Sequence, residues 1–557
     1  MELLNSDLKR IDNALSALGL DLSLPKIQAI IFSTRRLPEN LSFNLDDSLI
    51  PVRPSATYLG LLYTRKMNWL PHINSIKLKI SCKLNILSYL HGSSWGINQD
   101  VSRKLFISMI RPILDFGLPI YCRNFNLIER TNILQNSCLR KTLSVLRSTP
   151  TNNLNAESAI PPILNRFNFL TDKLLIRAMS LNHNPIIRNI KMLERSIMNS
   201  NYWVNKQHPL FLNRWFLRKP LLPKILKSDL PCSLMRDPVF QFFQPNTIFL
   251  DIPKKKLADH ISIQMNFNEL MRLKFRNFTQ YYTDGAKTAE YTTSAFLSNE
   301  FYKVYSLSEY NSIFEAESWA ILQAVEHSIS LNLSNVAICT DSHSVLINLI
   351  NQKPDLHPLI EETKEILFRY RERNIWLIWI PSHSGILGNE RVDQLTKSIH
   401  LAQPIDNKIF FKQLFPLISQ QNFNDWNSDW IACTWKGQRL KSLLPTLSRK
   451  PWFYRLDWKR SRITNLIRLR IGHGLFPTHL FRINLATSNL CECGSIGNLD
   501  HILFQCDKLK NRNFLFSELI NKSEIFPPYS TLYLLSVGDL NTLKSIALFL
   551  DKNDIHL

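Results

Sequence analysis

Four carboxylates in the middle of the chain stand where strands are expected to end or helices to begin. Asp284 follows the β-prone run "QYYT", and Asp341 ends the buried-strand pattern "NVAICTD". Asp393 lies in a helix expected after the loop "PSHSGILG", and Glu317 lies in a helix expected over residues 312–330. Because carboxylates at strand ends gather at one edge of an α/β sheet, we predict that these side chains converge.

The two acids in the first turns of the helix expected over 312–330 differ in their predicted orientation. At about 100° per residue, Glu317 falls on the apolar face that includes Ala316 and Ala320, whereas Glu315 falls on the opposite side. An ionised carboxylate that faces a core is unfavourable unless it is paired or binds a metal ion. We therefore take Glu317, and not Glu315, as a candidate site residue.

Each strand-end or helix-end acid also has a structural explanation. Asp284 could begin a turn, Asp341 could cap the next helix, and Asp393 could be a favourable charge near a helix start. Four converging carboxylates indicate a different role, because hard oxygen ligands suit Mg²⁺ or Mn²⁺. Two such ions about 4 Å apart can hold the attacking and leaving oxygens of a phosphodiester.

Residues 275–400 form the clearest globular unit of the sequence. Three strand-like runs are followed by a helix, a buried strand, two helices, a further strand and a closing helix. This order predicts an α/β layer fold.

The runs "YYTDGAK", "FEAESWAI", "ICTDSHSVL" and "WIPSHSGILGNERVD" resemble the motifs of type I ribonuclease H, in particular the version carried by non-LTR retrotransposons. The resemblance implies a ribonuclease H-like mixed five-stranded sheet with flanking helices. It implies that Asp284, Glu317, Asp341 and Asp393 bind two Mg²⁺ (or Mn²⁺) ions. His383 would be the loop histidine that assists proton transfer or product release. The implied activity is endonucleolytic hydrolysis of the RNA strand of RNA–DNA hybrids, with weak sequence preference.

The loop of His383 contains two glycines, Gly385 and Gly388. We interpret them as a source of flexibility that would let the histidine approach and leave the scissile phosphate.

Charge favours a nucleic-acid partner. The chain carries 67 Lys and Arg against 45 Asp and Glu, a formal net charge of +22. Residues 275–400 hold ten basic and fifteen acidic residues, so an acidic segment lies between strongly basic flanks. The expected partners are RNA–DNA hybrid, RNA and DNA, and charge for general solubility is the alternative explanation.

The sequence predicts an intracellular protein, nuclear or cytoplasmic. No run approaches the ~18 apolar residues of a membrane span. The N-terminus lacks the apolar run of a signal peptide. Nine cysteines, an odd number and mostly scattered, argue against a disulfide scaffold. We therefore expect neither secretion nor a membrane partner, and no oligomeric state is indicated.

The first 180 residues resemble the distal palm and thumb of a non-LTR reverse transcriptase, through runs such as "GLDLSLPKIQAIIFS", "SATYLGLLYTRKMNW" and "RPILDFGLPIYC". Lys26 and Tyr58–Gly60 fall where late palm motifs of that family lie. Asp46 and Asp47 follow that lysine instead of preceding it, so we interpret them as a polar hairpin turn. The polymerase motifs are therefore absent, as in a 5′-truncated element or partial gene, and we expect no primer extension.

The C-terminal region, residues 401–557, is expected to be basic and helical with a zinc-binding segment. Cys491, Cys493, His501 and Cys506 supply a Cys₃His set, which suits tetrahedral Zn²⁺. Buried or free thiols are the alternative, and the Cys-x-Cys opening is shorter than usual. The segment 491–506 also resembles the zinc-binding tail of the same retrotransposon proteins.

A basic and aromatic stretch near the C-terminus and a segment in the middle of the chain have further interpretations. In "KPWFYRLDWKRSRITNLIRLR", basic residues could follow a nucleic-acid backbone while aromatics stack on bases, or the Trp and Leu side chains could pack inward. Arg468, Arg470 and His473 could contact nucleic acid, or could form the solvated face of a helix. Residues 181–274 are predicted to be a helical, proline-rich connector.

The function that these observations favour is a metal-dependent ribonuclease acting on RNA–DNA hybrids in a retrotransposon-derived protein. The alternative is a catalytically inactive nucleic-acid-binding remnant of a reverse transcriptase, because the polymerase motifs are missing.

Overall fold

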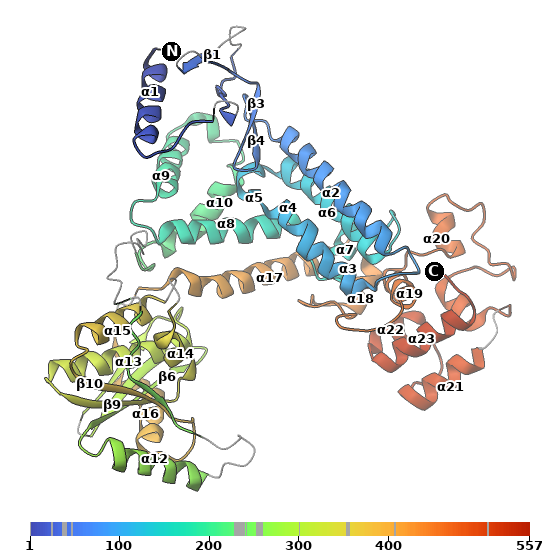
Figure 1. Cartoon of the computed structure of the whole chain (residues 1–557). Coiled ribbons are helices and arrows are strands. Elements are labelled where there is room, and N and C mark those ends of the chain that lie inside the picture. The colour runs from blue at the N-terminus through green and yellow to red at the C-terminus, as the bar shows by residue number, and fades with distance from the viewer. Residues whose placement is uncertain are drawn as a thin grey trace. The chain divides into compact units, whose positions relative to one another are not determined.

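The computed structural model describes the whole chain except residues 1, 24–25, 36–41, 46–47, 228–239, 241, 252–259, 300, 353–356, 406–407 and 509–511. It divides into two compact units, and each is built from separate stretches of the chain (Figure 1). The first unit consists of residues 1–171, 207–214 and 420–557, and the second consists of residues 172–206 and 215–419.

The second unit is organised around a seven-stranded mixed sheet with the order β11-β8-β7-β6-β9-β10-β5. The strands are β5 (Thr247–Phe249), β6 (Thr279–Lys287), β7 (Thr292–Ser298), β8 (Tyr302–Leu307), β9 (Asn335–Thr340), β10 (Asn374–Trp379) and β11 (Gln403–Pro404). β6, β7 and β8 are antiparallel neighbours, whereas β9 and β10 continue from β6 in parallel. The expected mixed sheet is confirmed, and five of its strands, β6 to β10, lie within residues 275–400 as predicted. β5 and β11 come from the flanking segments and extend the sheet to seven strands.

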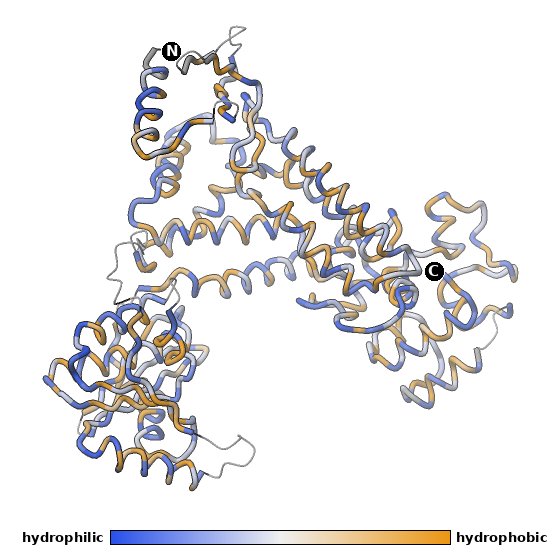
Figure 2. Tube along the Cα trace, in the orientation of Figure 1, coloured by the Kyte–Doolittle hydropathy of each residue, from blue (hydrophilic) through white to orange (hydrophobic). Residues whose placement is uncertain are grey.

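Helices cover both faces of this sheet (Figure 1). They are α12 (His260–Lys274), α13 (Ile313–Ser330), α14 (His343–Ile350), α15 (Pro358–Arg369) and α16 (Leu387–Lys397). Val336 and Ile338 of β9 pack in the core formed with α13, α14 and α15. The alternate residues Ala337 and Cys339 pack with α12. Figure 2 shows the resulting hydrophobic colouring of the central strands. This alternation is the two-residue period expected for a strand buried on both faces.

The segment predicted as a connector, residues 181–274, is helical in part. It contains α9 (Pro185–Met198) and α10 (Leu210–Arg218), as expected. It also contributes β5 to the sheet edge and α12 to one sheet face. A strand of three residues is too short to show the alternation of apolar and polar residues by which strands are recognised in a sequence. For this reason β5 was not predicted.

The first unit contains two hairpins, which follow its first helix, and is otherwise mainly helical. The hairpins pair β1 (Ser42–Leu45) with β2 (Ser48–Pro51) and β3 (Ser55–Tyr58) with β4 (Leu61–Thr64). Its N-terminal helices are α1 (Glu2–Ser16), α2 (Leu70–Leu90), α3 (Gln99–Leu105), α4 (Arg111–Asp115), α5 (Leu118–Tyr121), α6 (Phe125–Leu143), α7 (Thr151–Ser158) and α8 (Ile163–Met179). Its C-terminal helices are α17 (Leu414–Ala432), α18 (Gln438–Leu443), α19 (Arg460–Ile471), α20 (Pro477–Arg482), α21 (Arg512–Ser523), α22 (Thr531–Val537) and α23 (Leu540–Lys552). α8 and α17 each continue into the second unit.

One hydrophobic core joins the two ends of the chain within this unit. Phe106 and Leu139 from the N-terminal part are buried in the same cluster as Trp430, Leu440 and Ile467 from the C-terminal part. Regions that we expected to be separate therefore share one core. Sequence periodicity shows that a helix has an apolar face, but it does not show which distant helix covers it.

The first hairpin bears on the two adjacent aspartates. Leu45 of β1 pairs with Ser48 of β2 in an antiparallel hairpin. Asp46 and Asp47 themselves lie outside the described residues. In the parts of the chain that the structure describes, no helix is both long and apolar enough to cross a membrane.

Candidate active site and metal centres

The register of two parallel strands brings the first pair of predicted acids together. Thr283 of β6 pairs with Thr340 of β9. Asp284 and Asp341 each follow one residue later, so they occupy equivalent positions on neighbouring strands. Both are half-buried.

Gly285 lets α13 approach the sheet closely enough to place the third acid beside this pair. A Cβ atom at Gly285 would lie 2.6 Å from the backbone nitrogen of Glu317 and 2.7 Å from the carbonyl carbon of Ala316. The Glu317 carboxylate accepts a hydrogen bond from Ser342 Oγ at 2.6 Å. Ser342 directly follows Asp341, so α13 and the end of β9 meet at this edge.

The expectation that Glu315 lies opposite the buried face is wrong. Its side chain is 2 % exposed. The carboxylate accepts the Ser312 backbone N–H at 2.9 Å in a capping box and lies 3.2 Å from His357 Nε2. A helical wheel of α13 cannot show that the start of α15 covers its first turn. Glu317 remains the half-buried acid that faces the strand ends.

Asp393 is placed by α16, which packs on the sheet through Val392. Thr396 Oγ1 lies 3.1 Å from Asp284 Oδ2 and 2.8 Å from the Asp393 carbonyl oxygen, so it links α16 to β6. Lys397 Nζ donates to Asp393 Oδ2 at 2.6 Å. Within the described residues, this is the one ion pair that involves any of the four predicted acids.

Burial and mutual repulsion make three of these acids hard to ionise together. Burial, followed by the charge of Asp341, raises the pKa of Asp284 to about 7. Burial also raises the pKa of Glu317 and of Asp341. Buried carboxylates that repel one another favour a proton or a cation between them, and a divalent ion supplies the larger charge.

Asn389 is a polar residue of the site that the sequence did not single out. Its side chain hydrogen-bonds Asp341 and thereby lowers the pKa of that acid. Asn389 is 4 % exposed, and its Oδ1 atom has no hydrogen-bond partner within the described part of the chain. The available signal was its position four residues before Asp393, on the same face of α16.

The loop that carries His383 is tied to α12. His383 is exposed and has a φ of +50°. Gln264 Nε2 donates to the carbonyl oxygens of Ser384 (3.3 Å) and Gly385 (3.0 Å). Glu390 Oε1 accepts the backbone N–H of Gly385 at 3.3 Å. The loop is thus held on both sides of its turn.

The two loop glycines have steric roles in this structure. Gly385 has a φ of +75°, which favours glycine. A Cβ atom at Gly388 would lie 2.3 Å from the Tyr282 ring. Close packing therefore explains Gly388, where we had interpreted it as a source of flexibility.

Ligand atoms of three or more His, Cys, Asp or Glu residues come within 4.8 Å of one another in two places among the described residues. One group is His383, Glu390 and Asp393, and the other is the C-terminal cysteine cluster. The three acids Asp284, Glu317 and Asp341 lie in the same region of the sheet. Their ligand atoms do not form a group of this kind. The oxygen-rich edge suits a hard cation such as Mg²⁺ or Mn²⁺.

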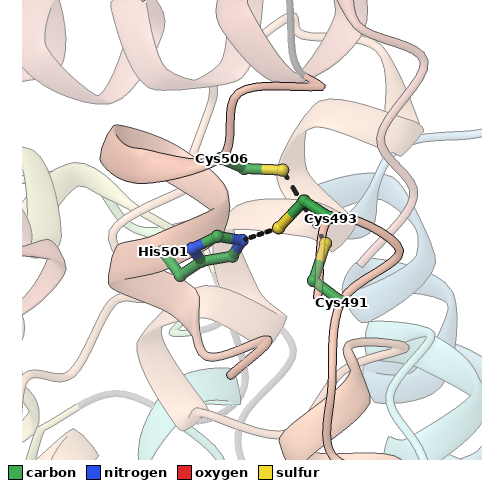
Figure 3. A group of neighbouring side chains, drawn as sticks. All are labelled: Cys491, Cys493, His501 and Cys506. Carbon is green, nitrogen blue, oxygen red and sulfur yellow. Dashed lines mark hydrogen bonds between the residues drawn. The ribbon is translucent and has the colours of Figure 1, made fainter. Parts of the chain in front are cut away.

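The C-terminal cluster brings together all four residues predicted as zinc ligands (Figure 3). Cys491 Sγ lies 3.7 Å from Cys506 Sγ, and Cys493 Sγ lies 3.1 Å from His501 Nε2. A Zn–S bond of about 2.3 Å places two sulfur ligands of a tetrahedral site about 3.8 Å apart. Hydrogen bonding with the Ser495 backbone lowers the pKa of Cys493 to about 6, which favours the thiolate that binds metals. The cluster is compatible with zinc.

Arg468 and Arg470 do not form the solvated face of a helix. They are 7 % and 6 % exposed. Arg468 donates to the Ser144 carbonyl oxygen at 3.0 and 2.6 Å, and Arg470 forms an ion pair with Glu157 at 2.9 Å. His473 is half-buried, and burial is the main cause that lowers its pKa to about 4. These residues join the C-terminal part of the first unit to its N-terminal part.

The aromatic residues upstream of α19 pack inward. Phe453 is fully buried. Trp452 Nε1 donates to Glu157 Oε1 at 2.5 Å. Of the two interpretations of this stretch, inward packing is confirmed for these side chains.

Comparison with known proteins gives a family match for part of the chain and a similarity to a retrotransposon protein. The ribonuclease H family model matches residues 276–400. The chain is also similar to a 115 kDa protein of the type-1 retrotransposable element R1DM from Drosophila melanogaster, with 25% identity over 117 residues. That similarity covers 20% of this chain and 12% of the relative, so it spans a small part of the relative's length.

Proposed function

Because residues 276–400 form a ribonuclease H domain, we propose that the chain hydrolyses the RNA strand of RNA–DNA hybrids within a retrotransposon-derived protein. The observation that supports this most is the placement of Asp284 and Asp341 on neighbouring strands, with Glu317 of α13 beside them. Their raised pKa values mark a site that favours bound cations.

The proposed roles of the side chains follow from their positions. Asp284, Glu317, Asp341 and Asp393 would hold two Mg²⁺ or Mn²⁺ ions. When bound, such ions activate a water molecule and stabilise the leaving oxygen. Water attacks the phosphorus, and the bond from phosphorus to the ribose O3′ breaks.

Two further side chains of the site would transfer protons or orient a carboxylate. His383 lies in an exposed loop beside Asp393, where it can receive or return a proton during the displacement. Asn389 orients the Asp341 carboxylate. Recognition of the RNA strand through its 2′-hydroxyl groups would select hybrids without reading their sequence.

The test is a cleavage assay with the full chain and end-labelled duplexes in Mg²⁺. We expect cuts in the RNA strand of an RNA–DNA hybrid and none in the matching DNA duplex. Glu365→Gln, which removes an exposed carboxylate of α15, should cleave at the wild-type rate. Binding of the hybrid without cleavage, where a known ribonuclease H cuts, would leave the inactive nucleic-acid-binding remnant as the function.

Gln264→Ala should slow cleavage about tenfold with little change in KM. The substitution removes both hydrogen bonds that hold the His383 loop to α12. Steady-state kinetics would separate kcat from KM. Gln323→Ala, on the opposite face of the sheet, is the matched control and should retain wild-type kinetics. Equal kinetics for both variants would contradict a positioning role for Gln264.

We further propose that Cys491, Cys493, His501 and Cys506 bind one Zn²⁺ ion. Cys506→Ser should abolish zinc retention, measured as metal content of the purified chain, and should lower the melting temperature of the first unit. Cys82→Ser replaces an exposed cysteine of α2 and should leave both unchanged. Full zinc content in the Cys506 variant would contradict the assignment.

A further inference from the structure

A basic hollow in the first unit is separate from every residue assigned to the nuclease. Its volume is about 910 Å³. It is lined by the end of α2, the loop that follows, the end of α6 and one residue of α19. Its cationic side chains are Arg140, Lys141, Arg147 and Arg468. None of the residues found to line it is acidic. We call this site the basic hollow.

Three cations of the basic hollow, Arg140, Lys141 and Arg147, form no ion pair within the described residues. Arg140 and Lys141 donate to neutral oxygens. Arg468 donates to the Ser144 carbonyl oxygen and to the terminal oxygen of Leu557. Arg470, two residues after Arg468, is instead neutralised by Glu157 at 2.9 Å. Arg140 Nε is buried and has no hydrogen-bond partner in the described chain. Partly desolvated cations without counter-charges favour an anionic ligand.

The walls of the basic hollow are fixed by a fifth cation behind them. Arg460 is 2 % exposed. Its guanidinium donates to the carbonyl oxygens of Gly92 (2.8 Å), Ile97 (2.7 Å) and Thr142 (3.0 Å). His91, also at the wall, stays neutral, because burial and the charge of Arg460 lower its pKa to about 4. The cations are therefore presented on a preorganised surface.

An exposed aromatic side chain adjoins the basic hollow. Trp95 is 57% exposed. The Trp95 ring lies against Gly92, where an added Cβ atom would come within 2.3 Å of the indole nitrogen. Gly92 itself lines the hollow. An aromatic surface thus adjoins the cations.

We propose that the basic hollow binds single-stranded nucleic acid, with backbone phosphates among Arg140, Lys141 and Arg147 and an unpaired base stacked on Trp95. Cations that follow a backbone beside an exposed aromatic ring are the combination that binds single strands. A duplex would satisfy the cations but would leave the ring unused, because its bases are already stacked. This inference goes beyond the nuclease activity and does not depend on it.

The experiment measures binding of the full chain to a labelled single-stranded DNA of roughly 12 nucleotides by fluorescence anisotropy over a range of salt concentrations. Lys141→Gln combined with Arg147→Gln should weaken binding at least fivefold. It should also reduce the slope of log K against log salt by about 0.7 for each lost phosphate contact. The control, Lys77→Gln with Lys79→Gln, removes the same charge from an exposed part of α2 and should change affinity less than twofold. Equal losses in both double variants would overturn the proposal in favour of general charge attraction.

Trp95 distinguishes a nucleic-acid site from a site for phosphate alone. Trp95→Ala should weaken single-strand binding about fivefold or more, and Trp95→Phe should restore most of it. Inorganic phosphate at millimolar concentration should compete weakly. Strong competition by phosphate, with no effect of Trp95→Ala, would identify a free-anion site and overturn the proposal. Tighter binding of a DNA duplex than of the single strand would overturn it as well.

Folding and nuclease activity serve as separate readouts for these variants. If the double variant melts at a lower temperature than the wild type, Arg147→Gln alone is used to test the site. This substitution changes only an exposed side chain. Cleavage of a short hybrid by the Trp95 variants should equal that of the wild type. Loss of single-strand binding with normal cleavage supports the proposal that the basic hollow binds single strands. Absence of cleavage in the wild type and in every variant would contradict only the proposed nuclease activity.

Discussion

Replacing Asp341 by asparagine should remove hybrid cleavage and at the same time stabilise the metal-free second unit. We expect the cleavage rate to fall about 100-fold or more, because the variant loses a carboxylate that would hold the metal ions. The stability gain has a separate cause. The Asp341 charge raises the pKa of Asp284 and of Glu317, so removing it relieves repulsion between buried carboxylates. Asparagine keeps the shape of the side chain and a polar group beside Asn389.

The stability gain should depend on pH in a defined direction. The pKa of Asp284 is about 7 in the folded protein against an ordinary value of 3.8. Between these values the folded state binds a proton that the unfolded chain has lost. The free energy of unfolding without metal should therefore fall as pH rises from about 4 to about 7. Burial is the largest cause of the raised pKa and stays in the variant, whereas the charge of Asp341 is lost. Asp341→Asn should therefore show a weaker pH dependence.

Thermal melting with and without Mg²⁺ would test this prediction. In the wild type, Mg²⁺ should raise the melting temperature of one transition, which identifies the second unit, and should do so more at pH 8 than at pH 5. In Asp341→Asn this transition should lie higher without metal and respond less to Mg²⁺. Glu365→Gln is the control and should behave as the wild type. A lower melting temperature for the metal-free variant would contradict repulsion as the cause.

The predictions from sequence succeeded where local pattern determines position. The strand patterns around Asp284 and Asp341 placed both acids side by side, because β6 and β9 pair in parallel. Asp284 was expected at the end of its strand, whereas β6 continues past it to Lys287. The sequence spacing also predicted the zinc-ligand set, whose four members are close in the chain. They are Cys491, Cys493, His501 and Cys506. In both cases the required information lies within a few residues of each side chain.

The predictions failed where a distant segment determines the environment. Glu315 is buried by the start of α15, and the His383 loop is held by Gln264 of α12. Arg470 is paired with Glu157, more than three hundred residues earlier in the chain. A helical wheel places the side chains of Glu315 and Arg470 on a polar face, because it takes no account of the helices that pack against them. Such long-range contacts are set by tertiary packing and not by the periodicity of either partner.

Arg460→Met should strongly destabilise the first unit. The guanidinium is 2 % exposed and donates to four carbonyl oxygens and to the Ser144 hydroxyl, whose Oγ lies 2.7 Å away. Methionine keeps an unbranched apolar side chain but leaves these acceptors buried without donors. We expect a loss of about 3–5 kcal/mol in the free energy of unfolding. Because Arg460 connects α19 to the loop after α2 and to the end of α6, the loss should affect both ends of the chain.

Urea unfolding followed by limited proteolysis would measure this effect and its reach. Arg462→Met, on the same helix, breaks a partly exposed ion pair with Asp551 at 2.6 Å and should lose less than about 1 kcal/mol. If the unit is one cooperative structure, Arg460→Met should expose protease sites before residue 171 and after residue 420 at the same urea concentration. Cleavage confined to the C-terminal part would mean that the N-terminal helices hold together without α19, which the shared burial of Phe106 and Ile467 argues against.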